Sequence, residues 1–178
     1  LKRLATDYVD IYQCHWPDPK TPLAETWGTM NQLRAEGKIR HIGVSNFDQP
    51  LIEEGCRHVP IITSQNQYSM LERGVETALW PFLRTQGIGI FIYGALAGGV
   101  LTGKYSTSPN FGHGDVRRFF YKFYQGEKFE RIMRTLAAIR ELMPRPLNQI
   151  AINWARQQPG VTSVFVGCRD AGQVKENA

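Results

Sequence analysis

Polar side chains that could bind a ligand follow three short runs of the 178-residue chain. His15 ends an aromatic-rich run at 7–15, Ser45 and Asn46 follow the apolar run 39–44, and Gln65 ends the run 61–65. In a parallel α/β sheet or barrel, ligands bind at the carboxyl ends of the strands. A structural alternative stays open, in which Ser45 and Asn46 only begin a turn before a helix that Asp48 caps.

These runs alternate with amphipathic segments that have the spacing of helices. Apolar, β-branched residues in short stretches predict strands at 7–15, 39–44, 61–65, 88–93 and 163–167. Helical spacing and cap residues predict a first helix from Pro22, with Thr21 as its cap, and a second at about 49–57. A third is expected at 76–86, with a break or bend at Pro81. Further helices are expected at 127–143, from Pro146 to about 157, and from 170 onward.

Helix-length connections between strands imply a parallel sheet. No G-x-G-x-x-G follows any of the strands, which favours barrel winding over a Rossmann sheet. A closed eight-stranded barrel needs roughly 200–250 residues. We therefore predict an α/β fold, a partial (β/α)8 TIM barrel of about five parallel strands with intervening helices, as a single domain over 1–178. We interpret the chain as a segment of a longer protein.

The stretch 94–126 is long and irregular, and such connections carry function or are mobile. It contains a Gly-rich part and a basic aromatic part at 117–123. We interpret the basic aromatic part as a lid or a partner-packing loop, in preference to a stacking surface for nucleic acid. The helix expected after it should bury one stripe, formed by Phe129, Ile132, Met133, Leu136, Ile139 and Met143.

Composition excludes several classes of function. The chain is 42% hydrophobic and 21% charged, as soluble globular proteins are, and no apolar run approaches the ~18 residues of a membrane span. The three cysteines are scattered and lack metal-site spacing, which favours reduced thiols, a cytoplasmic setting and no metal. The net charge of +5 fits an anionic ligand, and its spread along the chain speaks against nucleic acid.

Five motifs in consistent order resemble one family over nearly the whole chain. They are Asp7-Tyr8-Val9-Asp10-Ile11-Tyr12-Gln13 with His15-Trp16-Pro17-Asp18, the stretch from Gly37 to Phe47, Gln65-Asn66-Gln67-Tyr68-Ser69, Tyr93-Gly94-Ala95-Leu96 with Gly99-Val100-Leu101-Thr102-Gly103-Lys104-Tyr105, and Val166-Gly167-Cys168-Arg169 with Gln173, Glu176 and Asn177. These motifs resemble the fourth to eighth strands of the aldo-keto reductases, an NADP(H)-dependent oxidoreductase superfamily built on a (β/α)8 barrel.

The resemblance implies a nicotinamide site at the strand ends. Ser45, Asn46 and Gln65 would hydrogen-bond the carboxamide, whose donors and acceptors their side chains match. Tyr93 would stack on the nicotinamide ring and so decide which face delivers hydride. Taken without the motif that follows it, Tyr93 would be ordinary core.

The resemblance also implies a phosphate site. Gly94, Leu96 and Lys104 lie in the loop that would cover the pyrophosphate. A guanidinium and a helix N-terminus both favour a phosphate, and a solvated Arg at a helix start is the structural alternative. Cys168 stands where the family more often has Ser, Ala or Lys. Arg169, Gln173 and Asn177 would hold the adenosine 2′-phosphate, and the resemblance also counts Gly167 and Cys168 among the cofactor-binding residues.

The implied activity is hydride transfer between NADP(H) and an aldehyde or ketone. His15 would help to position the carbonyl oxygen, and Trp16 would line the substrate pocket. The Tyr that protonates this oxygen, and the Lys and Asp that tune it, belong to the first three strands in the family. We therefore expect this segment alone to be weak or inactive.

Two alternatives remain. The chain could be a non-catalytic truncated barrel that serves as an NADP(H)-binding module or as a protein-interaction module, and its open strand edges favour self-association. A different barrel chemistry, of an aldolase or a hydrolase, fits poorly because no Lys or carboxylate pair lies convincingly at the strand ends. His15 could likewise be a structural histidine if its flanking motif is set aside.

Overall fold

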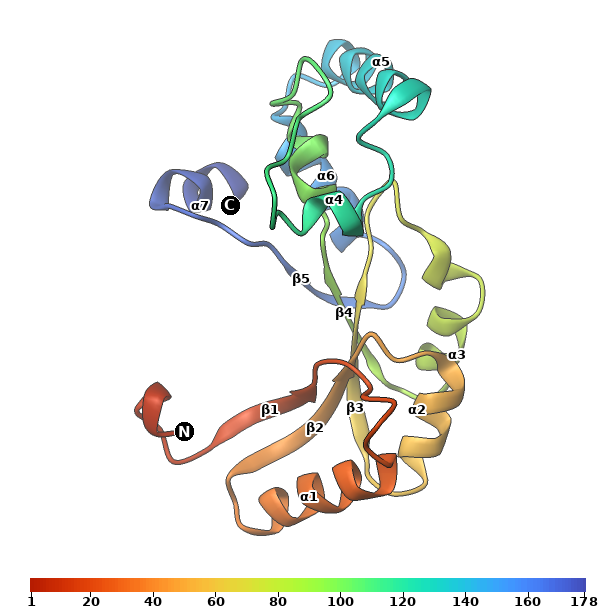
Figure 1. Cartoon of the computed structure of the whole chain (residues 1–178), viewed down its shortest axis with the longest axis vertical. Coiled ribbons are helices and arrows are strands. Elements are labelled where there is room, and N and C mark those ends of the chain that lie inside the picture. Colours follow the sequence, from red (N-terminus) through yellow and green to blue (C-terminus); the bar gives the residue numbers. More distant parts are fainter. The chain divides into compact units, whose positions relative to one another are not determined.

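The computed structural model describes the backbone of residues 1–178 and every side chain except that of Phe119, a residue of the basic aromatic part that lies outside the described residues. The chain forms one parallel sheet with intervening helices, which confirms the predicted α/β fold (Figure 1). The strand order in the sheet follows the sequence. The strands are β1 (Val9–Cys14), β2 (Ile39–Ser45), β3 (Ile61–Gln67), β4 (Gly89–Tyr93) and β5 (Val161–Phe165).

A helix follows or joins each pair of strands, as right-handed βα units require. The α-helices are α1 (Leu23–Ala35), α2 (Gln49–Cys56), α3 (Leu79–Thr85), α4 (Arg117–Phe120), α5 (Gly126–Leu142), α6 (Leu147–Arg156) and α7 (Ala171–Asn177), and 3₁₀ turns lie at Lys2–Leu4, Gly74–Glu76 and Ala97–Thr102. None of the described helices is long and apolar enough to cross a membrane.

The chain divides into two compact units. The first contains residues 1–67, 74–92 and 160–163, and the second contains 68–73, 93–159 and 164–178. Almost the whole sheet therefore lies in the first unit, and the last residues of β4 and β5 belong to the second. The expectation of a single domain over 1–178 stays a prediction.

In the first unit, α1 packs on β2 and α2 packs on β3 (Figure 1). Trp27 of α1 and Ile52 of α2 are fully buried, and the Trp27 ring lies 5.9 Å from the ring of Phe47, just after β2. Burying side chains of this size contributes about 1.5–3 kcal/mol each. The helices therefore hold the end of β2, and the polar residues that follow it, in one position.

Two predicted helix starts were wrong. The Thr21 hydroxyl donates to the Asp18 carboxylate at 2.8 Å, and Pro22 is the N-cap residue of α1, one position later than expected. The helix predicted at 76–86 begins only at Leu79, so Pro81 lies in its first turn. Backbone N–H groups have no intrahelical partner there, and Pro81 neither breaks nor bends the helix.

Three further boundaries moved. Strand β5 ends at Phe165, before Gly167, and β3 extends to Gln67, so that Gln65 lies inside the strand and not at its tip. Helix α5 ends at Leu142, and Met143 adopts an extended backbone and is 46% exposed. Met143 therefore does not belong to the buried stripe.

The helix α5 otherwise packs as expected. Phe129 and Leu136 are buried, and Ile132, Met133 and Ile139 pack around them at half-buried positions. These residues share a cluster with Val100 and Leu101 of the 3₁₀ turn and with Leu147 of α6. The second unit thus has an apolar core of its own.

Gly43 of β2 permits a close contact between the strands on either side. The Gln13 side chain of β1 crosses over it and donates to the Val44 carbonyl at 3.3 Å and to the Thr63 hydroxyl of β3 at 3.4 Å. A Cβ atom at position 43 would lie 2.9 Å from Gln13 Cγ and would clash with Thr63 Oγ1. The pairing of β2 with β3 also shifts register between Ile42 and Gly43. The absence of a side chain at Gly43 thus lets the Gln13 side chain of β1 reach the Thr63 side chain of β3.

We expect Gly43→Ala to lower the free energy of unfolding by about 1–3 kcal/mol, the cost of overpacking a buried site. Gly28→Ala is the matched control, because nothing lies within 4 Å of a Cβ atom at that helical position. Alanine should raise the stability there by up to about 1 kcal/mol. Urea unfolding monitored by tryptophan fluorescence measures both changes, and equal effects of the two variants would contradict this account of Gly43.

Candidate cofactor and active site

Asn46 adopts a left-handed backbone conformation at the end of β2. Its φ of 61° is one that asparagine tolerates better than most residues with a side chain. The turn aims its backbone N–H at the Gln65 carbonyl of β3, at 3.0 Å. The chain therefore leaves β2 while still attached to the neighbouring strand.

The side chains at this point form what we call the strand-end network, made of His15, Ser45, Asn46 and Gln65. Asn46 Nδ2 donates to the His15 carbonyl at 3.0 Å and to Ser45 Oγ at 3.1 Å. The Ser45 hydroxyl, only 1% exposed, donates to the Gln65 carbonyl at 3.1 Å. The network thus joins the ends of β1 and β2 to β3 by hydrogen bonds.

The structural alternative for Ser45 and Asn46 is also realised. Asp48 Oδ1 accepts a hydrogen bond from the Leu51 N–H at 3.1 Å and caps α2, so Ser45 and Asn46 do precede a capped helix. The two roles are compatible, because the turn that leads to the cap is the one that places both side chains at the strand end.

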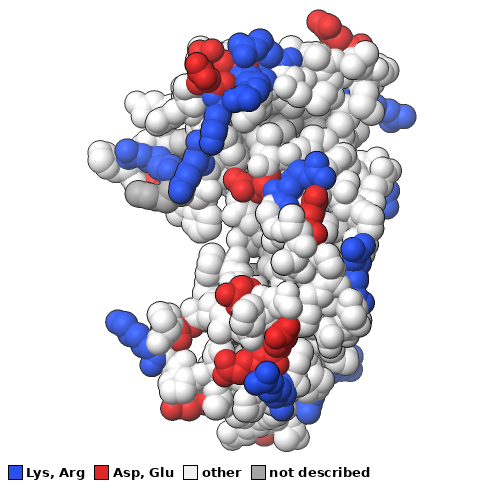
Figure 2. Space-filling view, turned by 90° about the vertical axis from the view of Figure 1, so that its right-hand side faces the viewer, with Lys and Arg blue, Asp and Glu red and all other residues white. Residues whose placement is uncertain are grey.

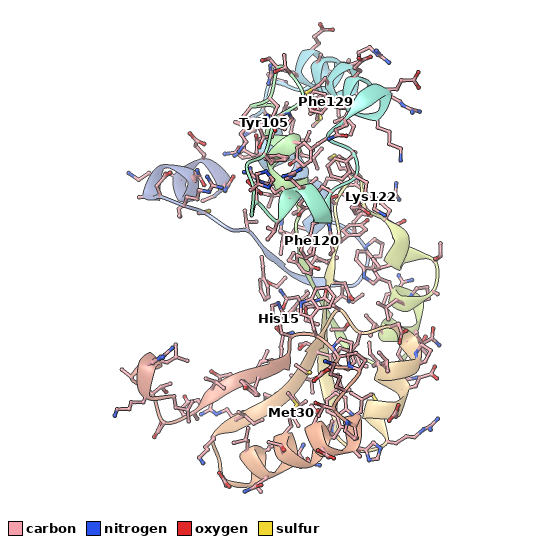
Figure 3. The ribbon with its side chains drawn as sticks, in the orientation of Figure 1. His15, Met30, Tyr105, Phe120, Lys122 and Phe129 are labelled. Atoms are coloured by element: carbon pink, nitrogen blue, oxygen red, sulfur yellow. The ribbon has the colours of Figure 1, made fainter. Side chains whose placement is uncertain are left out.

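Gln65 and His15 have capacity left for a ligand. The Gln65 side-chain amide is half-buried and forms no hydrogen bond with the described residues, although an amide can form up to four. His15 is exposed, and its ring lies 6.2 Å from that of Trp16, which is 50% exposed (Figure 3 labels His15). The adjacent Cys14 thiol donates to the Trp16 carbonyl at 3.4 Å, and burial raises its pKa.

A basic cavity of about 440 Å³ lies in the second unit, and we call it the phosphate cavity. Three cations line it, Lys104, Arg117 and Arg169, together with the single carboxylate of Glu176. The predicted cofactor residues that line it are Gly94, Leu96, Lys104, Gly167, Arg169, Gln173 and Asn177. The structure thus brings together residues from two sequence motifs more than sixty positions apart.

Tight backbone turns form one wall of the phosphate cavity. Gly98 and Gly99 have φ angles of 64° and 102°, and a Cβ atom at Gly98 would lie 2.7 Å from the Tyr121 ring and 2.7 Å from the Tyr124 hydroxyl. A Cβ atom at Gly99 would lie 3.1 Å from Lys104 Nζ. Glycine is therefore needed for the backbone conformation and for the approach of these side chains.

The segment after β5 is organised by hydrogen bonds around Cys168. The Arg169 N–H donates to Gln173 Oε1 at 3.0 Å, and Asn177 Nδ2 donates to Cys168 Sγ at 3.3 Å. Asn177 Oδ1 in turn accepts from Asn148 Nδ2 at 2.9 Å. Gln173 and Asn177 therefore position the turn that carries Arg169, which is itself exposed.

Sequence reasoning missed Arg117, Tyr121 and Asn148, which also line the phosphate cavity. The Arg117 guanidinium pairs with both carboxylate oxygens of Asp115 and donates to the Tyr105 hydroxyl at 3.1 Å. The sequence predicts a lid or a partner-packing loop for the basic aromatic part. A sequence signal was present in the carboxylate two residues before the arginine, where it can hold the guanidinium in place.

Tyr93 ends β4 beside this cavity and is half-buried. Its carbonyl accepts a hydrogen bond from the Tyr68 N–H at 3.0 Å, and burial, with Tyr121 nearby, raises the pKa of its phenol. The ring is thus neutral at physiological pH. Among the described residues no group of three or more His, Cys, Asp or Glu side chains is placed to hold a metal ion.

Comparison with known proteins matches this geometry to one family. Residues 1–178 match the Aldo/keto reductase family. Aldo-keto reductase YhdN of Bacillus subtilis is 36% identical over 98% of this chain and 54% of its own length, and the NADH-specific methylglyoxal reductase of Escherichia coli is 33% identical over 99% and 55%. The glycerol dehydrogenase AKR11B4 of Gluconobacter oxydans superposes with a TM-score of 0.89, at 31% identity, over 98% of this chain and 54% of that structure.

The chain therefore belongs to the aldo/keto reductase family, as its motifs predicted. It spans about half the length of these relatives. The five parallel strands correspond to part of the (β/α)8 barrel of the structural neighbours, which confirms the predicted partial barrel.

Two substitutions of Asn46 separate the contribution of its side-chain hydrogen bonds from the cost of its left-handed backbone. Asn46→Ala removes the side-chain hydrogen bonds, each worth about 0.5–1.5 kcal/mol, and leaves a Cβ atom in a left-handed conformation that costs about 1–2 kcal/mol. Asn46→Gly removes the same hydrogen bonds without that cost. In urea unfolding the glycine variant should therefore lie between the wild type and the alanine variant. Identical stabilities of the two variants would show that the left-handed turn carries no strain.

Pairing with Arg117 lowers the pKa of Asp115 from 3.8 to about 2. When folding lowers the pKa of a carboxyl group, its ionised form stabilises the folded state at pH values above the pKa of the unfolded chain. This stabilisation is lost as the pH falls through the pKa of the folded state. The stability difference between wild type and Asp115→Asn should therefore hold from pH 7 to about 4 and vanish by about 2. Urea unfolding across this range measures it, and in an Arg117→Gln background the pH dependence should be much smaller, because the main partner of the carboxylate is then lost.

Proposed function

We propose that this chain provides the cofactor side of an oxidoreductase that transfers hydride between NADP(H) and an aldehyde or ketone. The observation that carries the proposal is the phosphate cavity, where seven residues predicted from sequence line one basic cavity with three cations. Family membership and the strand-end network support it. When bound, the nicotinamide supplies or accepts the hydride.

The strand-end network suits the nicotinamide carboxamide. The half-buried Gln65 amide can both donate and accept, and it has no partner among the described residues. Ser45 and Asn46 both donate hydrogen bonds to the Gln65 carbonyl and so hold the part of β3 that carries this amide, in addition to offering their own polar atoms. We assign Tyr93, whose phenol stays neutral, to stack on the ring.

The phosphate cavity suits the pyrophosphate and the adenosine 2′-phosphate. Lys104 lies over the Gly98–Gly99 turn, where a diphosphate can approach the backbone closely. We assign Arg169 to the 2′-phosphate, since a guanidinium forms bidentate, charge-assisted hydrogen bonds with phosphate. This assignment makes NADPH the preferred cofactor, in contrast to the Escherichia coli relative that is named as NADH-specific.

His15 and Trp16 would face the substrate. The exposed imidazole can donate a hydrogen bond to a carbonyl oxygen, and the half-exposed indole offers an apolar wall beside it. A separate acid has to deliver the proton, and we assign none of the tyrosines of this chain to that task. The 178-residue chain assayed alone should accordingly bind cofactor and reduce carbonyl compounds weakly or not at all.

We further propose that the chain behaves as one cytoplasmic domain and that it self-associates. In the described sheet β1 pairs on one side with β2 and lies at an edge, and β5 lies at the other edge. Unpaired strand edges favour pairing with another chain. Light scattering at increasing concentration measures this, and a monomer at high concentration would contradict it.

The cofactor proposal predicts a selective effect of Arg169→Gln. Loss of a charge-assisted contact to a phosphate costs about 1.5–3 kcal/mol, so NADPH should bind about 10- to 100-fold more weakly, whereas NADH should change less than threefold. Quenching of tryptophan fluorescence during titration with each cofactor measures the two affinities.

Arg134→Gln is the matched control. Arg134 is an exposed arginine of α5 that lies 4.0 Å from Glu130 and does not line the phosphate cavity. Its replacement should leave both affinities unchanged. Equal weakening of NADPH and NADH by Arg169→Gln would refute the assignment to the 2′-phosphate, and an absence of binding to either cofactor in the wild type would refute the cofactor proposal itself.

A further inference from the structure

A second cavity of the second unit has no assigned role. It has a volume of about 810 Å³, within the range of about 300–1,000 Å³ typical of small-molecule sites. We call it the α5 groove, because one face of α5 forms its longest wall. Its other walls are the turn after β3 and the segment that joins α4 to α5.

The floor of the α5 groove is apolar. Leu101, Phe123 and Leu136 are buried core residues that contribute to it. Half-buried side chains extend it on both sides, and these are Met70, Leu71, Ile132 and Ile139. Phe120 also lines the groove and is 46% exposed (labelled in Figure 3). An elongated apolar group would remove much of this surface from water.

The rim of the α5 groove is basic. Lys122, Lys128 and Arg131 line it, are exposed, and form no ion pair with the described residues. Lys128 and Arg131 are three positions apart on α5 and therefore neighbours on one helix face. Figure 2 shows basic and acidic side chains next to one another at the top of the view. Glu72 is the single carboxylate among the lining residues, so the rim carries a net positive charge.

The α5 groove shares a wall with the phosphate cavity. Residues 120, 122 and 123 line the groove, whereas Tyr121 between them lines the phosphate cavity. The Tyr121 ring lies where it would contact any side chain at Gly98, on the turn that we assign to the pyrophosphate. A ligand in the groove would therefore contact the same short segment that borders the phosphate cavity.

We propose that the α5 groove binds an amphipathic carboxylate with an aliphatic tail, such as a fatty-acid anion. The carboxylate would contact Lys128, Arg131 and Lys122, and the tail would lie along Ile132, Ile139 and Leu71. This class of ligand fits because the groove combines an apolar floor with a basic rim whose cations form no ion pair with the described residues. A neutral lipid would leave the three cations unused, and a small inorganic anion would leave the floor in water.

Calorimetric titration of the 178-residue chain with dodecanoate, below its micelle concentration, tests the proposal. We expect saturable one-to-one binding, at least tenfold tighter than the binding of dodecanol. The double variant Lys128→Gln/Arg131→Gln should weaken dodecanoate binding at least tenfold, because two charge-assisted contacts are lost. Both replacements are at exposed positions, and circular dichroism checks that α5 stays folded.

Two controls make the test specific. Arg134→Gln alters the same helix outside the groove and should change the affinity less than twofold. Arg156→Gln alters a neighbouring cavity of about 920 Å³, which shares Met70 and Ile139 with the groove, and should likewise have little effect. Equal binding of dodecanol and dodecanoate, no binding of either, or loss of binding in Arg156→Gln instead of the double variant would each overturn the proposal.

Measuring the oligomeric state tests the other possible occupant of the α5 groove, a second copy of the chain. If the double variant changes the concentration dependence of light scattering, and dodecanoate does not bind, the α5 groove is a contact between copies of the chain and the proposal is wrong. The assay does not use NADP(H), so its result is independent of the proposed oxidoreductase function.

Discussion

The left-handed turn at Asn46 is the constraint on which the first unit's site depends. In one residue the chain leaves a buried strand, bonds to the carbonyls of His15 and Gln65, and starts toward a capped helix. An apolar residue at this position would lack the side-chain hydrogen bonds to the His15 carbonyl and to Ser45 Oγ, and its left-handed backbone would cost free energy. The polar pair therefore serves the fold as well as any ligand, and binding residues that also carry structure are held rigidly in place.

Charge organises the second unit in a similar way. Arg117 would be a mobile cation in a long connection, but Asp115 and the Tyr105 hydroxyl hold its guanidinium at the border of the phosphate cavity. The same connection then contributes buried Phe123 and Tyr124 to the core. The proposed anion site would therefore need little further ordering of Arg117 when a ligand binds.

Much of the fold could be predicted because it depends on local patterns. Strand–helix alternation and the Asp48 cap both follow from residue type and spacing. Thr21, Pro81 and Met143 were misjudged because a competing hydrogen bond, a late helix start or an early helix end is decided by neighbours in space. Arg117 and Asn148 were missed for the same reason, since only tertiary packing brings them to the cavity. The motif residues were found through family resemblance, not through periodicity.

The most direct test of a phosphate cavity for NADP(H) is a calorimetric titration with 2′,5′-ADP, the adenosine half of that cofactor, compared with 5′-ADP. All residues that line the cavity belong to the second unit. The 178-residue chain should therefore bind 2′,5′-ADP without help from the strand-end network. We predict saturable binding of 2′,5′-ADP at least tenfold tighter than that of 5′-ADP. Equal affinities, or no binding of 2′,5′-ADP, would contradict the assignment of Lys104, Arg117 and Arg169 to an NADP(H) site.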